Sequence, residues 1–178
     1  MGVIRRMVGT VVLVIGLAGM SLLFAQGSTS AQEDDVKKHA ACPYCGMDRA
    51  KFAHSRMYVE YEGGSSMGTC SLHCAAMEFA LKIDKTPASI MVGDYNSKKL
   101  IDAEKAFWVI GGDQMGVMTT RAKWAFGDKA AADLFITQHG GRLATFEDCL
   151  RASFEDMYDD INMVRKKRQM MKQMKHGG

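Results

Sequence analysis

The sequence predicts an α+β protein with two β-β-α-β units, a treble-clef-like cysteine knuckle in the first unit, and a long helix at the C-terminal end. Apolar and polar residues alternate over 57–62, as they do in a half-buried strand. Glycine pairs at 63–64 and 140–141 lie where a turn and a helix stop are needed. No Pro or Gly occurs from Glu147 to Lys175, so one continuous helix is expected there.

The first unit begins with a hairpin and continues into a helix. The strand over 57–62 turns at the first glycine pair into a second strand over 66–70. Ser71 is a favourable N-cap, which predicts that a helix begins directly after it. Residues 89–95 are expected to form the strand that closes this unit.

The second unit repeats this order without the cysteines. Its expected elements are strands at 106–110 and 123–126, a helix at 128–138 and a final strand at 142–146. Ala131, Leu134 and Phe135 share one face of that helix, as burial of a single face requires. The two units therefore span about 40–95 and 104–147 in a chain of 178 residues.

Residues 1–31 have the three-part form of a secretory signal. Arg5 and Arg6 precede an uncharged apolar stretch over 7–25, and a polar run follows over 26–35. The apolar stretch has 19 residues, close to the roughly 20 that span a bilayer, so an uncleaved N-terminal anchor is the alternative. Both interpretations predict a periplasmic or other extracytoplasmic location, and the second adds membrane association through the N-terminus.

The rest of the chain divides at about residue 150. Residues 32–150 form the expected metal-binding domain, and 151–178 form a basic, methionine-rich helical tail. Such a tail can rest on anionic lipid or contact a partner protein, and a solvated helix that frays is the alternative. Cys149 is remote in sequence from the other thiols and is expected to be a small buried residue.

Composition narrows the function. The formal net charge of +3 falls to +1 without Arg5 and Arg6, so the chain has no basic footprint and no nucleic-acid partner is expected. The chain contains 15 Met and 5 Cys, which supply many polarizable sulfur atoms. Soft-metal binding is therefore the class of function that the composition favours.

Four cysteines carry the strongest signal. Cys42 and Cys45 form a Cys-x-x-Cys turn, and Cys70 and Cys74 follow after 24 intervening residues. Such a turn brings two thiolates towards one ion, and Gly46 supplies the backbone freedom to complete it. The second pair brackets the start of the predicted helix, whose dipole favours thiolate over thiol. Knuckle, hairpin and helix in this order are typical of treble-clef metal modules.

The identity of the metal stays open between copper and zinc. Four thiolates alone suffice for structural Zn²⁺. Met47, Met67 and His73 lie close to the cysteines in sequence and add the thioether and imidazole donors that favour Cu(I), so copper is the expected metal. Two structural disulfides are a further alternative, because an extracytoplasmic compartment is oxidising.

A glycine-rich loop over 111–118 is a second candidate site. Asp113, Met115 and Met118 bring a carboxylate and two thioethers into one flexible stretch, which suits weak or transient binding of copper. An ordinary surface loop with a methionine tucked beneath it is the alternative.

These motifs resemble the NosL family. The similarity lies in Cys42-Pro43-Tyr44-Cys45-Gly46-Met47, in 70–74, in 112–118, and in His139-Gly140-Gly141 with Phe146-Glu147. The resemblance implies a periplasmic Cu(I)-binding accessory protein with paired β-β-α-β units that delivers copper to nitrous oxide reductase. It also places Asp113 and Met118 at family ligand positions. The family commonly has a lipid-anchored cysteine just after the signal, whereas Cys42 is the first cysteine here, and Thr120 stands where a histidine often follows the loop methionine.

Three functions follow as expectations. The first is a copper carrier that passes Cu(I) to a periplasmic copper-receiving protein without catalysing a reaction. Its expected ligands are Cys42, Cys45, Met47, Cys70, His73, Cys74, Asp113 and Met118. The second is a zinc knuckle of the TRASH kind, which the four cysteines also resemble, with a role in protein contact. The third is a thiol-disulfide oxidoreductase, although the expected thioredoxin-like β-α-β setting is missing around the Cys-x-x-Cys turn.

Overall fold

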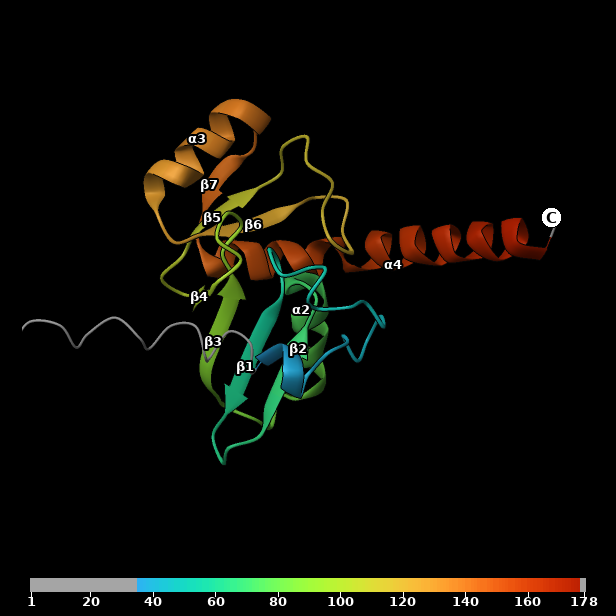
Figure 1. Cartoon of the computed structure of the whole chain (residues 1–178), viewed down its shortest axis with the longest axis horizontal. Coiled ribbons are helices and arrows are strands. Elements are labelled where there is room, and N and C mark those ends of the chain that lie inside the picture. Colours follow the sequence, from blue (N-terminus) through green and yellow to red (C-terminus); the bar gives the residue numbers. More distant parts are fainter. Residues whose placement is uncertain (1–34, 177–178) are drawn as a thin grey trace, which may run out of the picture.

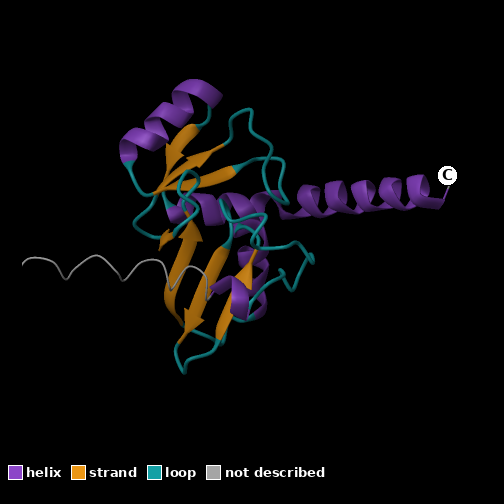
Figure 2. Cartoon of the chain, in the orientation of Figure 1, coloured by secondary structure: helices purple, strands orange, loops and turns teal. Residues whose placement is uncertain are grey.

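The computed structural model describes residues 35–176, and the expected signal segment 1–31 lies outside the described residues. Two small antiparallel sheets lie towards opposite ends of the molecule, and the C-terminal helix α4 (Phe146–His176) runs between them before projecting outward (Figure 1). Each sheet has its own helix beside it (Figure 2). The order β-β-α-β occurs twice, so the predicted α+β class with paired units and a long terminal helix is confirmed.

The first unit has a four-stranded sheet. Its elements are β1 (Met57–Tyr61), β2 (Ser66–Thr69), α2 (Leu72–Leu81), β3 (Pro87–Gly93) and β4 (Leu100–Asp102), with the antiparallel strand order β2-β1-β3-β4. Met57, Val59 and Tyr61 are buried, whereas Glu60 is exposed, because side chains of a strand alternate between its faces. The sequence does not predict β4, since three residues are too few to show alternation; β4 is recognised by its pairing with β3.

The second unit has a three-stranded sheet. Its elements are β5 (Phe107–Ile110), β6 (Lys123–Phe126), α3 (Lys129–His139) and β7 (Arg142–Ala144), with the strand order β6-β5-β7. The Asp128 side chain caps α3 by accepting from Ala131 N at 3.2 Å, and Gly140 ends the helix with φ of 74°. The two sheets are connected where Tyr95 N donates to Ala125 O at 2.8 Å.

Helix α4 begins with a reciprocal cap. Thr145 N donates to the Asp148 carboxylate and Asp148 N donates to Thr145 Oγ1, each at 3.1 Å. The helix has 31 residues, which corresponds to a length of about 46 Å. Its buried residues are Phe146, Cys149, Ala152, Ser153 and Asp160. Among residues 35–176, no helix combines the length and the apolar character that crossing a bilayer demands.

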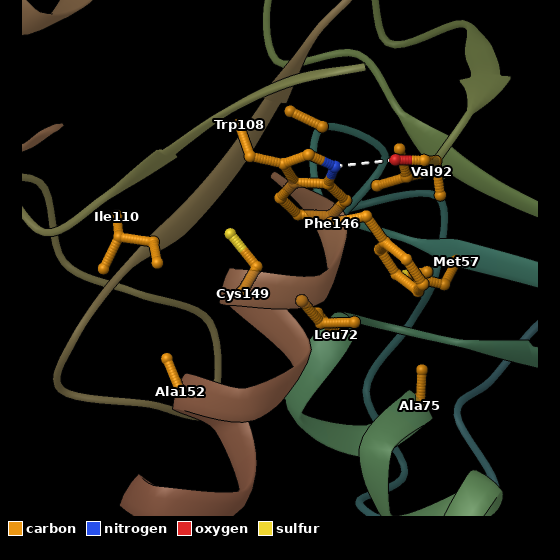
Figure 3. Packing of buried hydrophobic residues seen from close by; sticks show 11 residues of the cluster. Met57, Leu72, Ala75, Val92, Trp108, Ile110, Phe146, Cys149 and Ala152 are labelled. Carbon is orange, nitrogen blue, oxygen red and sulfur yellow. Dashed lines mark hydrogen bonds between the residues drawn. The ribbon is translucent and has the colours of Figure 1, made fainter. Parts of the chain in front are cut away.

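A core around Trp108 holds the two units together (Figure 3). Trp108 is 1% exposed, and its indole N–H donates to Ala103 O at 2.7 Å. Met57 and Leu72 from the first unit and Phe146 from α4 belong to the same cluster. The core therefore fixes α2 and α4 against both sheets.

A second apolar cluster includes the cysteines. Cys42 and Cys70 from the first unit share it with Trp124, Phe126 and Phe135 from the second unit. The aromatic side chains of Phe126 and Phe135 have ring centroids 5.3 Å apart. The cysteine-bearing segments of the first unit therefore rest on the core of the second.

Candidate metal centre

Four cysteine side chains converge at one point. The sulfur atoms of Cys42, Cys45, Cys70 and Cys74, hereafter the four-cysteine site, all lie within 4.8 Å of one another. The Cys45 and Cys70 sulfurs are 3.4 Å apart, and the Cys70 and Cys74 sulfurs are 3.8 Å apart. These separations exceed an S–S bond of about 2.05 Å, and all four thiols are free. Metal–sulfur bonds of about 2.3 Å place tetrahedral sulfurs about 3.8 Å apart, so the spacing fits one ion.

The first cysteine pair is positioned by a tight backbone turn. Gly46 N donates to Cys42 O at 2.8 Å, and Cys42 N donates to Met47 O at 2.9 Å. Gly46 has φ of 77°, a left-handed conformation that most side chains disfavour. The predicted contribution of Gly46 to the turn is therefore confirmed.

The second pair lies at the junction between β2 and α2. Cys70 follows the strand, Ser71 occupies the N-cap, and Cys74 lies in the first turn of the helix. The Ser71 side chain makes no capping hydrogen bond, and its hydroxyl oxygen lies 3.8 Å from Cys70 Sγ instead. The helix N-terminus contributes a partial positive charge that favours thiolate at this position.

Burial distinguishes Cys45 from the other three cysteines. Cys42 is 1% exposed, and Cys70 and Cys74 are fully buried. Cys45 is only half-buried. Cys45 is therefore the least buried cysteine of the site.

Contacts among the four thiols shift their pKa values in different directions. Hydrogen bonding from Cys45, and then from Cys70 and Cys74, lowers the pKa of Cys42 because thiol donors stabilise its thiolate. Contact with Cys42 and Cys45, together with burial, raises the pKa of Cys70 and of Cys74. Without metal, the site therefore favours thiolate at Cys42 and keeps Cys70 and Cys74 protonated. A cation that binds must displace those protons.

A buried arginine, Arg49, anchors the knuckle. Its guanidinium donates to Asp35 Oδ2 at 2.6 Å, and to the main-chain oxygens of Met57 and Thr69 at 2.9 and 3.1 Å. It also donates to His39 O at 2.7 Å. Arg49 thus connects the N-terminal segment to β1 and β2 immediately before the second cysteine pair. Sequence reasoning missed this residue, because its partners lie 8 to 20 positions away and no local pattern marks it as buried.

A buried carboxylate, Glu78, connects the two halves of the site. Tyr44, which precedes Cys45, donates to Glu78 Oε2, and Tyr61 donates to Glu78 Oε1 at 3.1 Å. Burial, and then contact with this carboxylate, raises the pKa of both tyrosine hydroxyls. Glu78 lies on α2, so it holds the first cysteine pair against the helix that contains Cys74.

The two predicted thioether ligands lie beside the same apolar cluster as the cysteines. Met47 and Met118 are partly buried and pack against it. Met118 has φ of 63°, which is uncommon for a residue other than glycine. The structure therefore brings Met118, remote in sequence, against the apolar cluster to which Cys42, Cys70 and Cys74 belong.

His73 belongs to α2, and its side chain faces α4. Its Nδ1 is 3.3 Å from Asp160 Oδ2, and both side chains are buried. Neither of these two atoms has a well-aligned hydrogen bond. Burial lowers the pKa of His73. Asp160 also accepts from Thr120 N at 2.9 Å, so it connects α2, α4 and the segment after Met118.

Asp113 lies in different surroundings from Met118. Its Oδ1 is 3.1 Å from His139 Nδ1, and Gln114 Nε2 is 3.0 Å from both atoms. The Asp113 side chain is 67% exposed, and Met115 is also exposed. The loop therefore presents Asp113 to solvent beside His139 while Met118 packs inward. Sequence reasoning noted the His139-Gly140-Gly141 motif but did not pair His139 with Asp113.

Cys149 is separate from the four-cysteine site. It is fully buried in the core around Trp108. Burial raises the pKa of its thiol to about 12. The prediction that Cys149 is a small buried residue is confirmed.

Comparison with known proteins agrees with the motifs. A family model described as NosL matches residues 33–154. A crystal structure described as the copper chaperone NosL from Shewanella denitrificans is similar, with 24% sequence identity and a TM-score of 0.48. The similarity covers 60% of this chain and 87% of that chain. Comparison with curated proteins gives no match.

Proposed function

Because the chain belongs to the NosL family, we propose that it is an exported copper-binding accessory protein that holds Cu(I) at the four-cysteine site and passes it to a periplasmic copper-receiving protein. The observation that carries this proposal is the convergence of four sulfurs within 4.8 Å. Thiolates are preferred ligands of Cu(I), so the donor set suits this cargo.

Handover of the ion proceeds through the exposed side of the site. Cys45 is half-buried, so an incoming ligand from the acceptor protein can replace its sulfur first. Met47 and Met118 serve as thioether ligands during this exchange, since both pack against the apolar cluster that includes three of the four cysteines. The ion moves between soft ligands, and no reaction is catalysed.

Asp113 and His73 contribute in different ways. The exposed carboxylate of Asp113 offsets the charge of a cation held weakly at the loop. His73 contacts Asp160 and thereby orients the start of α2, where Cys74 lies. The proposed ligand set thus divides into a tight thiol site and a weaker loop site.

The client and the location follow from the family resemblance and the N-terminal sequence. Nitrous oxide reductase is the specific copper-receiving enzyme that the resemblance suggests. Residues 1–31 direct export or anchor the chain, 32–150 bind metal, and 151–178 form the tail.

Replacement of one thiol tests the copper site. In Cys45→Ser, a hydroxyl replaces a soft ligand, so affinity for Cu(I) should fall at least tenfold in competition with a Cu(I) chelator. Cys149→Ser is the matched control, because Cys149 is a free cysteine outside the site. Its affinity should stay unchanged. Equal affinity in wild type and both variants would rule out the four-cysteine site as the place where copper binds.

Zinc is the second candidate metal, and the sulfur spacing favours it equally. The observed separations of 3.4 and 3.8 Å are close to the tetrahedral value of about 3.8 Å. Metal analysis of protein purified without added metal separates the two proposals. Stoichiometric zinc that Cu(I) does not displace would identify a structural knuckle.

A thiol-disulfide oxidoreductase would instead show a reversible disulfide between Cys42 and Cys45 and turnover of a disulfide substrate.

A further inference from the structure

The last twelve residues of α4 form a cationic rod. Residues 165–176 contain six Lys or Arg and no Asp or Glu, whereas the acidic residues of α4 all lie within 147–160. From Arg165 onward, the described side chains are exposed. This part of the helix projects from the body (Figure 1) and is about 18 Å long.

Three methionines form an apolar stripe on this rod. Met170, Met171 and Met174 are 59%, 57% and 72% exposed. At about 100° per residue they occupy a sector of about 100° around the helix axis, and Met163 falls in the same sector. Lys167 also lies within it, and its long aliphatic stem lets the ammonium group reach past the apolar side chains. The segment therefore combines a narrow apolar face with cations on both sides.

The rod is held beside the four-cysteine site. Arg168 Nη2 donates to Cys45 O at 3.1 Å. Cys45 is the half-buried member of the site. The N-terminal part of the rod therefore lies next to the least buried cysteine of the site.

We propose that segment 165–176 binds the surface of an anionic phospholipid bilayer, with the methionines in the interface and the cations on headgroup phosphates. Clusters of four to eight cations on an amphipathic helix are typical of binding to anionic lipid. The rod is straight and carries only positive formal charges, so it can lie along a flat bilayer surface on which negative headgroups are evenly distributed. An acidic protein would need acceptor groups spaced to match the rod.

This inference goes beyond the proposed copper function. It assigns the tail a peripheral position along the membrane surface, independent of any N-terminal anchor. The four-cysteine site is then held near the bilayer surface, because Arg168 of the rod contacts Cys45.

A fluorescence reporter on the full chain tests the proposal. Met174→Trp places an indole on the exposed stripe, while Trp108 and Trp124 are buried and provide a constant background. Emission should shift to the blue with phosphatidylcholine vesicles that contain phosphatidylglycerol, and should not shift with phosphatidylcholine alone. High salt should reverse the shift, because it screens the attraction. The reporter detects contact of the tail even when the N-terminus anchors the chain.

Two charge variants in the reporter background locate the effect. Replacing Lys167, Lys172 and Lys175 by Gln should weaken the phosphatidylglycerol-dependent shift roughly 100-fold in lipid concentration, since each cation near an anionic surface contributes about fivefold. The matched control replaces Lys51, Lys82 and Lys99, three exposed lysines elsewhere, by Gln and should change the shift little. Equal loss in both variants would show that net charge alone acts, and it would overturn the proposal.

Substitutions of the methionines separate apolar contact from metal ligation. Met170→Leu with Met171→Leu should retain the shift, because leucine provides similar apolar surface. Loss of the shift in this variant would contradict interfacial binding. No blue shift on any vesicle, with Cu(I) affinity intact, would overturn the membrane proposal and leave the copper proposal standing. If the tail does not bind vesicles but is needed for copper transfer to an acceptor protein, it is a protein-docking segment instead.

Discussion

Replacing Arg49 with methionine tests whether a buried arginine holds the four-cysteine site together. The Arg49 side chain is completely buried and donates five hydrogen bonds. Methionine keeps most of the length and the apolar stem but removes the guanidinium. Asp35 retains Arg56, whose Nε lies 3.0 Å from the carboxylate, so the acid is not left without a counter-charge. The main-chain oxygens of Thr69 and Met57 lose their hydrogen bonds from this guanidinium.

The expected loss of stability follows from these contacts. Removing one partner of a buried ion pair costs about 3–5 kcal/mol. The remaining guanidinium of Arg56 favours the lower end of that range. A buried main-chain oxygen that loses its donor and gains no water costs about 1–3 kcal/mol. The loss in free energy of unfolding should therefore not fall below that range for the ion pair. We therefore expect Arg49→Met to lower the free energy of unfolding by about 3–4 kcal/mol, a large part of the roughly 5–15 kcal/mol of a typical domain.

Urea unfolding of the metal-free protein, followed by tryptophan fluorescence, measures this loss. Arg142→Met is the matched control, because Arg142 is exposed and its substitution should change stability by no more than about 0.5 kcal/mol. Arg49→Met should also weaken Cu(I) binding, since the Arg49 side chain fixes the start of β1 and the end of β2, directly before Cys70. A loss for Arg49→Met no larger than that for Arg142→Met would refute the anchoring role.

Three further predictions concern the metal and the placement of the chain. Affinity for Cu(I) should rise with pH across the neutral range, because the raised pKa of Cys70 and Cys74 keeps protons on ligands that the metal must displace. Competition with a Cu(I) chelator at several pH values measures this affinity, and equal affinity at every pH would contradict the prediction. Met118→Ala and Asp113→Ala should each reduce a second, exchangeable copper equivalent but leave the thiol-bound metal in place. Titration with Cu(I) before and after alkylation of the thiols counts the copper bound at each site. If alkylation removes all bound copper and neither loop substitution changes binding, there is no loop site. Residues 32–178, expressed without the N-terminal segment, should remain soluble, and insoluble protein with bound metal would contradict this.

Local sequence patterns predict the main elements because their causes are local. Alternation over 57–61 reflects burial of one strand face, and the structure places β1 at those residues. The strand at 123–126 is also found at the predicted residues. The helix expected at 128–138 is shifted by one residue, since Asp128 is its cap and not its first helical residue.

Contacts between distant segments decide what local patterns leave open. Strand β4 exists because Met91, Val92 and Gly93 of β3 pair with it, and its own three residues show no pattern. The burial of Arg49 depends on Asp35 and on strands that follow it in the chain. No local preference for burial of an arginine exists, so such a residue is recognised only when its partners are in place.

The sequence by itself determined the α+β class, the repeated units, the family and the grouping of four cysteines, because each depends on spacing along the chain. The tertiary structure decided how those cysteines meet. It brought the sulfurs within 4.8 Å and left Cys45 as the accessible one. It also separated Asp113, paired with His139, from Met118, which packs against the apolar cluster that includes three of the cysteines. Such divisions arise from packing between the units, since the apolar cluster that receives Met118 is built from residues far apart in sequence.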